Sequence, residues 1–278
     1  MLSTHIDPFY FIFTLNNSGS TVFSQLLANN ILDGYLPPHG NNEGQWIPEV
    51  TDMMRKDPWN PQTKMDWEFI KSTWRKYLTN ASKKIFIESS PPNMIRIKSI
   101  QDYFKPKGAC LFISNPYLHI SSCIHRYSKN ETFKNAAQRL SYSWLDKAKF
   151  QLENVQNFQN LPLIKYEHFC VHPEQAARKA LKQLQKNEKN KIITTNIKGK
   201  KNTLMKSITN MTPRHLAFLG DEGIDIINTI LSEHPTTLYQ LGYELIGHKK
   251  ATRILNSNLL QACQGITNRL QWEQIHQI

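Results

Sequence analysis

The sequence is poor in cysteine and lacks long apolar runs. These two absences argue against a disulfide-rich protein, a zinc protein and a membrane protein. Only four cysteines occur among 278 residues, and no two of them form a C-x-x-C pair. Neither a disulfide scaffold nor a zinc site is therefore predicted. The apolar runs are far shorter than the ~20 residues of a membrane-spanning helix, and no basic region precedes an apolar core near the first residue. We expect a soluble, cytoplasmic protein with no metal and no membrane partner.

The sequence has fewer acidic than basic residues. The chain has 34 Lys and Arg against 22 Asp and Glu, a formal net charge of +12. Such an excess favours a polyanionic partner, which could be a nucleic acid, a membrane surface or a phosphorylated ligand. Many of the lysines lie between residues 182 and 206, without the interleaved aromatic residues of a single-strand-binding surface. A nucleic-acid-binding module is therefore the least favoured of the functions considered below, and no nucleic-acid partner is expected.

Residues 9–30 predict a strand, a short polar loop and a helix. Residues 9–13 (FYFIF) are typical of a strand buried on both faces, and helical spacing of apolar residues begins at Phe23. Residues 18–21 (SGST) have small side chains, so their backbone N–H groups can converge on an anion, and a side chain at Gly19 is expected to block its approach. The alternative is an ordinary turn with a hydroxyl N-cap.

The same loop lacks two glycine signatures. It has neither the G-x-x-x-x-G-K-[ST] pattern of Walker-type NTPases nor the G-x-G-x-x-G pattern of Rossmann dehydrogenases. Both of these nucleotide-binding classes are therefore disfavoured.

The rest of the chain predicts an α/β fold. Further strands at 84–88, 109–114 and 161–166 alternate with helical patterns, which indicates a mainly parallel sheet with helices on both faces and ligands beyond the strand carboxyl ends. Residues 33–60, rich in Pro, Gly and Asn, predict a long loop beside the anion site. No linker divides the sequence, so residues 1–278 are expected to form one domain.

Additional helices are predicted towards the C-terminus. The last of them carries one apolar stripe, which we expect to lie in the core, with a dimer contact as the alternative and the oligomeric state left open. The stripe consists of Leu255, Leu259, Cys263, Ile266 and Leu270.

Four segments, in this order, resemble the sulfotransferases that use 3′-phosphoadenosine 5′-phosphosulfate (PAPS), and a closing L-G-Y completes the pattern. The resemblance spans nearly the whole chain and implies a P-loop NTPase-like sulfotransferase fold, PAPS as donor, 3′-phosphoadenosine 5′-phosphate (PAP) as product, and a small-molecule acceptor. The matching residues are Asn17 to Thr21 (NSGST), Glu88 to Asn93 (ESSPPN), Ser114 to Ser122 (SNP followed by Ser122), Lys165 to Phe169 (KYEHF) with Pro173, and Leu241 to Tyr243.

The resemblance also implies which residues bind the cofactor. The loop residues would hold the 5′-phosphosulfate, residues of the third segment the 3′-phosphate, and a late basic segment would close over it. The implied residues are Asn16, Asn17, Ser18, Gly19, Ser20 and Thr21, then Asn115 and Ser122, then Lys198, Gly199 and Lys200. Arg126, four residues beyond Ser122 on the same helix face, is a further cofactor-binding candidate.

Three positions depart from the family pattern, because Asn17, Ser89 and Ser114 are neutral where the family usually has a cation. A charge-assisted hydrogen bond contributes roughly 1.5–3 kcal/mol against about 1 kcal/mol for a neutral one. Arg126 and the late lysines are the expected substitutes. Two other functions stay open: a small-molecule kinase with an atypical phosphate loop, and a catalytically inactive PAP-binding protein.

Two residues of the 33–60 segment are candidates for the base. Glu43 lies where a related branch of the sulfotransferases has a catalytic glutamate, and His39 is the alternative because imidazole titrates near neutral pH. Acidic and aromatic residues gather in the same segment, so Trp46 and Glu49 are expected to bind a cationic acceptor. The sulfuryl group would be transferred to a hydroxyl or nitrogen of this acceptor. The chain is similar in general appearance to bacterial natural-product tailoring sulfotransferases, including those that modify guanidinium alkaloids of the saxitoxin type.

Overall fold

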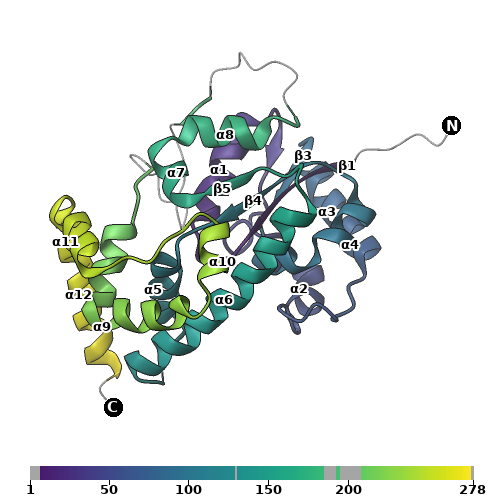
Figure 1. Ribbon diagram of the computed structural model, residues 1–278. Helices are drawn as coiled ribbons and strands as arrows, with labels where there is room; N and C mark the ends of the chain where they lie inside the picture. The colour runs from purple at the N-terminus through teal and green to yellow at the C-terminus, as the bar shows by residue number, and fades with distance from the viewer. Residues whose placement is uncertain (1–6, 129, 185–191, 195–207, 277–278) are drawn as a thin grey trace. The chain divides into compact units, whose positions relative to one another are not determined.

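The computed structural model describes residues 7–128, 130–184, 192–194 and 208–276. The predicted basic segment with Lys198, Gly199 and Lys200 lies outside the described residues. The chain divides into two compact units, residues 1–113 with 154–208 and residues 114–153 with 209–278, and each is described by itself. The elements are labelled in Figure 1.

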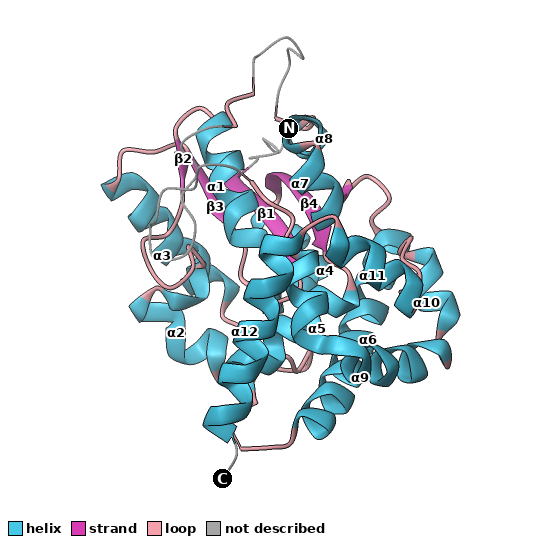
Figure 2. Ribbon diagram, turned by 90° about the vertical axis from the view of Figure 1, so that its left-hand side faces the viewer, coloured by secondary structure: helices cyan, strands magenta, loops and turns pink. Residues whose placement is uncertain are grey.

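The first unit contains a five-stranded sheet in which every pair of neighbouring strands is parallel. This confirms the predicted α/β class, and all four predicted strands are present. They are labelled in Figure 1, and Figure 2 colours the strands magenta. The fifth, β2, has only two residues, which is too short to leave a periodic signal. From one edge to the other the strands are β2 (Gly34–Tyr35), β3 (Ile85–Glu88), β1 (Asp7–Thr14), β4 (Pro106–Ile113) and β5 (Leu163–Lys165).

Helices cover both faces of this sheet, as predicted. On β1, Phe9 and Phe11 point to one face, where both contact Trp74 and Phe104. Tyr10 points to the other face and donates its hydroxyl to the Ala180 carbonyl oxygen at 2.6 Å. The alternation follows from the two-residue period of a strand. Trp74 belongs to α3 (Trp67–Asn80), Phe104 to α4 (Ile97–Phe104) and Ala180 to α8 (Pro173–Leu181), while α1 (Ser20–Asn30) and α7 (Tyr166–Val171) complete the α8 face.

The segment predicted as one long loop is more ordered than expected. Besides β2, it contains the short 3₁₀ helix η1 (Gly44–Trp46) and the helix α2 (Pro48–Arg55). Pro48 suits the first position of a helix, and Val50 and Met54 bury one narrow face. With only eight residues, α2 gave too short a pattern to stand out from its surroundings. A second 3₁₀ helix, η2 (Pro91–Arg96), follows β3.

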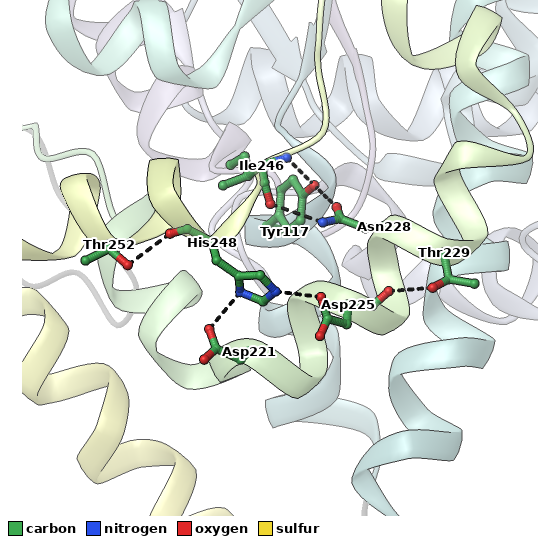
Figure 3. Close-up of polar contacts among 8 residues, drawn as sticks. All are labelled: Tyr117, Asp221, Asp225, Asn228, Thr229, Ile246, His248 and Thr252. Carbon is green, nitrogen blue, oxygen red and sulfur yellow. Dashed lines mark hydrogen bonds and ion pairs between the residues drawn. The ribbon is translucent and has the colours of Figure 1, made fainter.

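The second unit is helical, and Figure 3 shows polar contacts among eight of its residues. The Tyr117 hydroxyl donates to Asn228 and accepts from the Ile246 N–H at 2.7 Å. His248 bridges Asp221 and Asp225, each at 2.9 Å, and these carboxylates raise its pKa. The helices are α5 (Pro116–Tyr127), α6 (Phe133–Asn157, which continues into the first unit), α9 (Thr212–Ser232), α10 (Pro235–Gln240), α11 (His248–Asn256) and α12 (Leu259–His276). No helix in the described part of the chain is long and apolar enough to cross a membrane.

The orientation of α12 differs from the prediction. Its apolar stripe faces solvent, with Leu259, Ile266 and Leu270 each more than half exposed. Instead, α12 packs on α9 through its small residues, because a Cβ on Gly265 would lie 2.2 Å from the Arg214 carbonyl oxygen. The prediction that this stripe lies in the core is therefore wrong. The face with small residues is buried instead, because it allows the backbones of α9 and α12 to approach closely.

Two substitutions on α12 test this orientation. Gly265→Val should lower the free energy of unfolding by about 1–3 kcal/mol, because the new side chain meets backbone that cannot move aside. Leu270→Ala should change it by about 0.5 kcal/mol or less, as expected for an exposed site. Chemical denaturation of both variants measures this. A loss of about 2–5 kcal/mol in Leu270→Ala would instead place the stripe in the core.

Candidate functional site

The carboxyl edge of the sheet in the first unit brings polar segments together. Because the strands are parallel, the loop after β1, the Ser89-Ser90 pair after β3 and Lys165 at the end of β5 all lie at this edge. The register places Glu88 beside Phe11, three residues before the end of β1. This edge is where an open α/β sheet usually binds its ligand.

The loop after β1 has the backbone geometry of an anion site. Asn17 and Gly19 adopt positive φ values of 54° and 91°, and α1 begins at the next residue. Among the described residues, the N–H groups of Gly19, Ser20 and Thr21 have no hydrogen-bond acceptor. Free N–H groups at the positive end of a helix dipole attract an anion. The loop can therefore bind a phosphate or sulfate through its backbone.

The side chain of Ser18 takes no part in this. It is fully buried, donates to the Leu15 carbonyl oxygen at 2.7 Å and lies 2.6 Å from the Thr14 hydroxyl. These bonds hold the loop in its bent conformation, so Ser18 contributes through its backbone. Asn16 and Asn17 are half-buried.

The expected reason for glycine at position 19 needs correction. A Cβ there would lie 2.5 Å from Cδ2 of Tyr166, and the Tyr166 ring is itself buried. Gly19 is thus required because the first turn of α7 covers it and because its φ is positive. A larger residue at this position would strain the loop whether or not an anion approaches.

Both candidate bases lie on the turn that precedes η1. Gly40 and Asn42 have positive φ values, and the His39 carbonyl oxygen accepts from the Asn42 N–H at 3.0 Å. His39 itself packs edge-on against Tyr77. Glu43 is only 8% exposed, and one of its carboxylate oxygens accepts from Gln45 Nε2 and, at 3.1 Å, from Trp46 Nε1. A carboxylate held this firmly suits a directional proton transfer better than the half-buried imidazole.

A second carboxylate, which sequence reasoning did not identify as functional, lies against this turn. Glu88 is fully buried, and burial raises its pKa to about 7, with a smaller contribution from Glu43 in the same direction. Its contacts include the N–H groups of Gly44 at 2.6 Å and of Ser90 at 2.8 Å. The signal in the sequence was an acid at the end of a strand, directly before Ser-Ser-Pro-Pro.

The predicted acceptor residues already have partners within the chain. The Arg55 guanidinium lies 3.6 Å above the centre of the Trp46 ring. Tyr77 donates its hydroxyl to Glu49, with oxygen–oxygen distances of 3.0 and 3.3 Å. The Trp46 ring thus binds a guanidinium in this structure, supplied by α2.

The predicted 3′-phosphate residues belong to the second unit. Asn115 caps α5 by accepting from the Leu118 N–H at 2.8 Å, and it donates to Thr212 at 3.1 Å. Ser122 and Arg126 lie four residues apart on α5, hence on one face, and both are half-buried. Asn115 thus lies at the start of α5, Ser122 and Arg126 lie along it, and their role in cofactor binding stays a prediction.

Two of the neutral positions are unusual in their hydrogen bonding. The hydroxyls of Ser89 and Ser114 are buried and have no partner among the described residues. An unsatisfied buried hydroxyl costs about 1–3 kcal/mol.

At the sheet edge, Lys165 is a cation that was not among the predicted site residues. Its pKa is lowered mainly by burial and also by Lys179.

Comparison with protein-family models finds no match, and comparison with curated proteins finds none. Among solved structures, the chain is similar to the sulfotransferase domain from the curacin biosynthetic pathway, with 16% identity and a TM-score of 0.40 over 92% of this chain and 98% of that one. It is also similar to the sulfotransferase domain from the Synechococcus PCC 7002 olefin synthase, with 14% identity and a TM-score of 0.39 over 83% and 97% of the two chains. At these values the similarity carries no argument about function.

The packing at Gly19 is open to a direct test. Gly19→Ala should destabilise the protein by more than Gly220→Ala, because both have positive φ but only Gly19 meets another side chain. Strain alone costs about 1–3 kcal/mol, and the overlap with Tyr166 adds a further cost of about 1–3 kcal/mol. Unfolding free energies of the two variants give the comparison. Equal losses would mean that Tyr166 does not restrain the loop.

Proposed function

We propose that this chain is a PAPS-dependent sulfotransferase that moves a sulfuryl group to a hydroxyl or nitrogen of a small, cationic natural product. The observation that carries the proposal is the loop after β1, whose N–H groups at Gly19, Ser20 and Thr21 have no acceptor among the described residues. It follows the central strand and lies at the same sheet edge as the end of β3, which contacts the turn carrying Glu43. The order of the sequence motifs adds support for PAPS in particular.

In this proposal each group of the first unit has a defined task. The backbone N–H groups from Gly19 to Thr21 bind the 5′-phosphosulfate and stabilise negative charge that grows on the leaving phosphate. Glu43 accepts the proton of the acceptor hydroxyl or nitrogen. At the same time, the bond between that acceptor atom and sulfur forms, and the bond between sulfur and the phosphate oxygen breaks. The products are then PAP, the sulfated acceptor and a proton. Most of the catalysis would come from positioning and from fixed dipoles.

Three observations support a cationic acceptor. The helix α2 exposes carboxylates at Glu49 and Asp52, while the chain as a whole has a net positive charge. The stacking of Arg55 on Trp46 supports a guanidinium-binding character of this aromatic ring. A neutral residue at position 17 also removes a charge that would repel such an acceptor.

A catalytically inactive PAP-binding protein is the second candidate. It is favoured by the neutral side chains of Asn17, Ser89 and Ser114, where the resembled family usually has cations. In that case the unpartnered hydroxyl of Ser89 would serve binding alone. Both the sulfotransferase and the inactive protein would bind PAP, but only the sulfotransferase would turn over PAPS.

Ligand binding is the first test. PAP at 100 times its dissociation constant should stabilise the protein by about 2.7 kcal/mol, which raises its melting temperature by several degrees, whereas ATP and an oligonucleotide should have smaller effects. Arg126→Ala should reduce the PAP shift. Arg253→Ala is the matched control, since it removes an exposed cation of the same unit on α11. A larger shift with ATP would favour a kinase.

Turnover is tested by incubating the protein and PAPS with guanidinium, amine and neutral phenol acceptors and measuring PAP release. The guanidinium or amine acceptors should be preferred. Glu43→Gln should lower kcat by about 10²–10⁴-fold, the usual contribution of a general base, while PAP affinity stays unchanged. Preference for phenols would refute the cationic acceptor, and full activity of Glu43→Gln would exclude Glu43 as the base. PAP binding without any turnover would favour the second candidate.

A further inference from the structure

Glu88 is the meeting point of three N–H donors from two separate segments. Its Oε2 accepts from the Gly44 N–H at 2.6 Å, and its Oε1 accepts from the Ser90 N–H at 2.8 Å and from Asn93 Nδ2 at 3.0 Å. The carboxylate is fully buried at the end of β3. Such an arrangement matches a carboxylate, which has two acceptor oxygens and no donor.

The contact with Gly44 fixes the turn to the sheet. A Cβ on Gly44 would lie 2.5 Å from Glu88 Oε2 and 2.7 Å from Cζ2 of Trp74, so no side chain fits there. The next residue is tied as well, because the Gln45 N–H donates to Ser90 Oγ at 3.0 Å. Two successive N–H groups of the turn therefore bind to the last residue of β3 and to Ser90, which follows it.

These are the residues that hold Glu43. It directly precedes Gly44, and one of its oxygens accepts from Gln45 and Trp46. If the Gly44 and Gln45 backbone shifts, the donors that orient the Glu43 carboxylate shift with it. The position of Glu43 is thus determined by Glu88, a residue 44 positions beyond Gly44 in the sequence.

A neutral amide cannot replace this carboxylate. Glutamine has one acceptor oxygen and one NH₂ group. In Glu88, by contrast, both carboxylate oxygens accept hydrogen bonds from N–H donors. With the glutamine oxygen towards Ser90 and Asn93, its NH₂ would face the Gly44 N–H.

We propose that Glu88 is a positioning residue for sulfuryl transfer, which sets Glu43 at the carboxyl edge of the sheet by holding the Gly44 and Gln45 backbone. The inference rests on the proposed function in that Glu43 acts as the base. It assigns Glu88 no contact with the donor or the acceptor. Glu88 and Glu43 would then act as one unit.

The experiment combines kinetics with a cycle of variants. Glu88→Gln should lower kcat by about 10–10³-fold, with the PAP dissociation constant unchanged. Glu88→Gln combined with Glu43→Gln should be no slower than Glu43→Gln alone, because residues that act as a unit are not additive. Gly44→Ala breaks the same contact from the other side and should behave like Glu88→Gln, so it replaces Glu88→Gln if that variant fails to fold. An independent, additive loss would overturn the proposal.

Asp7→Asn is the matched control. Asp7 is another buried carboxylate of the first unit, paired with Lys71 and Arg75 at the opposite end of β1. Its substitution should lower stability and leave kcat unchanged. If Asp7→Asn lowers kcat as much as Glu88→Gln does, loss of stability explains both effects and the positioning role is refuted.

A readout that needs no turnover separates this inference from the proposed function. The indole N–H of Trp46 donates to Glu43, so its ¹H–¹⁵N resonance reports the position of that carboxylate in the protein alone. The resonance should shift in Glu88→Gln and Gly44→Ala and stay in place in Asp7→Asn. No shift in the first two variants would overturn the positioning role. A shift without sulfuryl transfer in the wild type would support it and refute the proposed function instead.

Discussion

Parallel pairing of the central strand is the constraint on which the first unit depends. β1 is buried on both faces and pairs with β3 on one side and β4 on the other. Parallel pairing directs the carboxyl end of every strand to the same edge. Small polar residues can then gather at that edge, where the chain leaves each strand, while the rest of the strand stays apolar.

The two parts of the candidate site are built in different ways. The loop after β1 offers backbone N–H groups and depends on two residues with positive φ and on cover by Tyr166. The Glu43 turn depends on side-chain acceptors, with Glu88 at its base. Backbone donors keep their polarity at every pH, whereas the Glu88 carboxyl titrates, and burial raises its pKa to about 7. Anion binding and proton transfer can therefore respond differently to pH.

The sequence predicted the elements of the fold better than their mutual packing. The buried strand at residues 9–13 and the long amphipathic helices carry strong periodic signals, and all of them are present. The short β2 and α2 carry too few residues for such a signal. The face of α12 was predicted wrongly, because counting apolar residues ignores how closely a glycine lets two backbones approach. Within the candidate site, the loop after β1 was predicted from residue types alone, but the Glu88 contact joins residues 44 positions apart and follows only from the three-dimensional structure.

The outward stripe of α12 has a consequence for how the molecules behave in concentrated solution. The segment from Leu259 to His276 has Arg269 and Glu273 as its charged residues, and these two are paired with each other. A chain with a formal net charge of +12 repels its own copies at low ionic strength, where the screening length is about 30 Å at 0.01 M salt. At 1 M salt that length falls to about 3 Å, and the apolar stripe then meets other molecules without this repulsion. Colloidal stability should therefore decrease as salt is added, the reverse of what is seen when proteins associate through opposite charges.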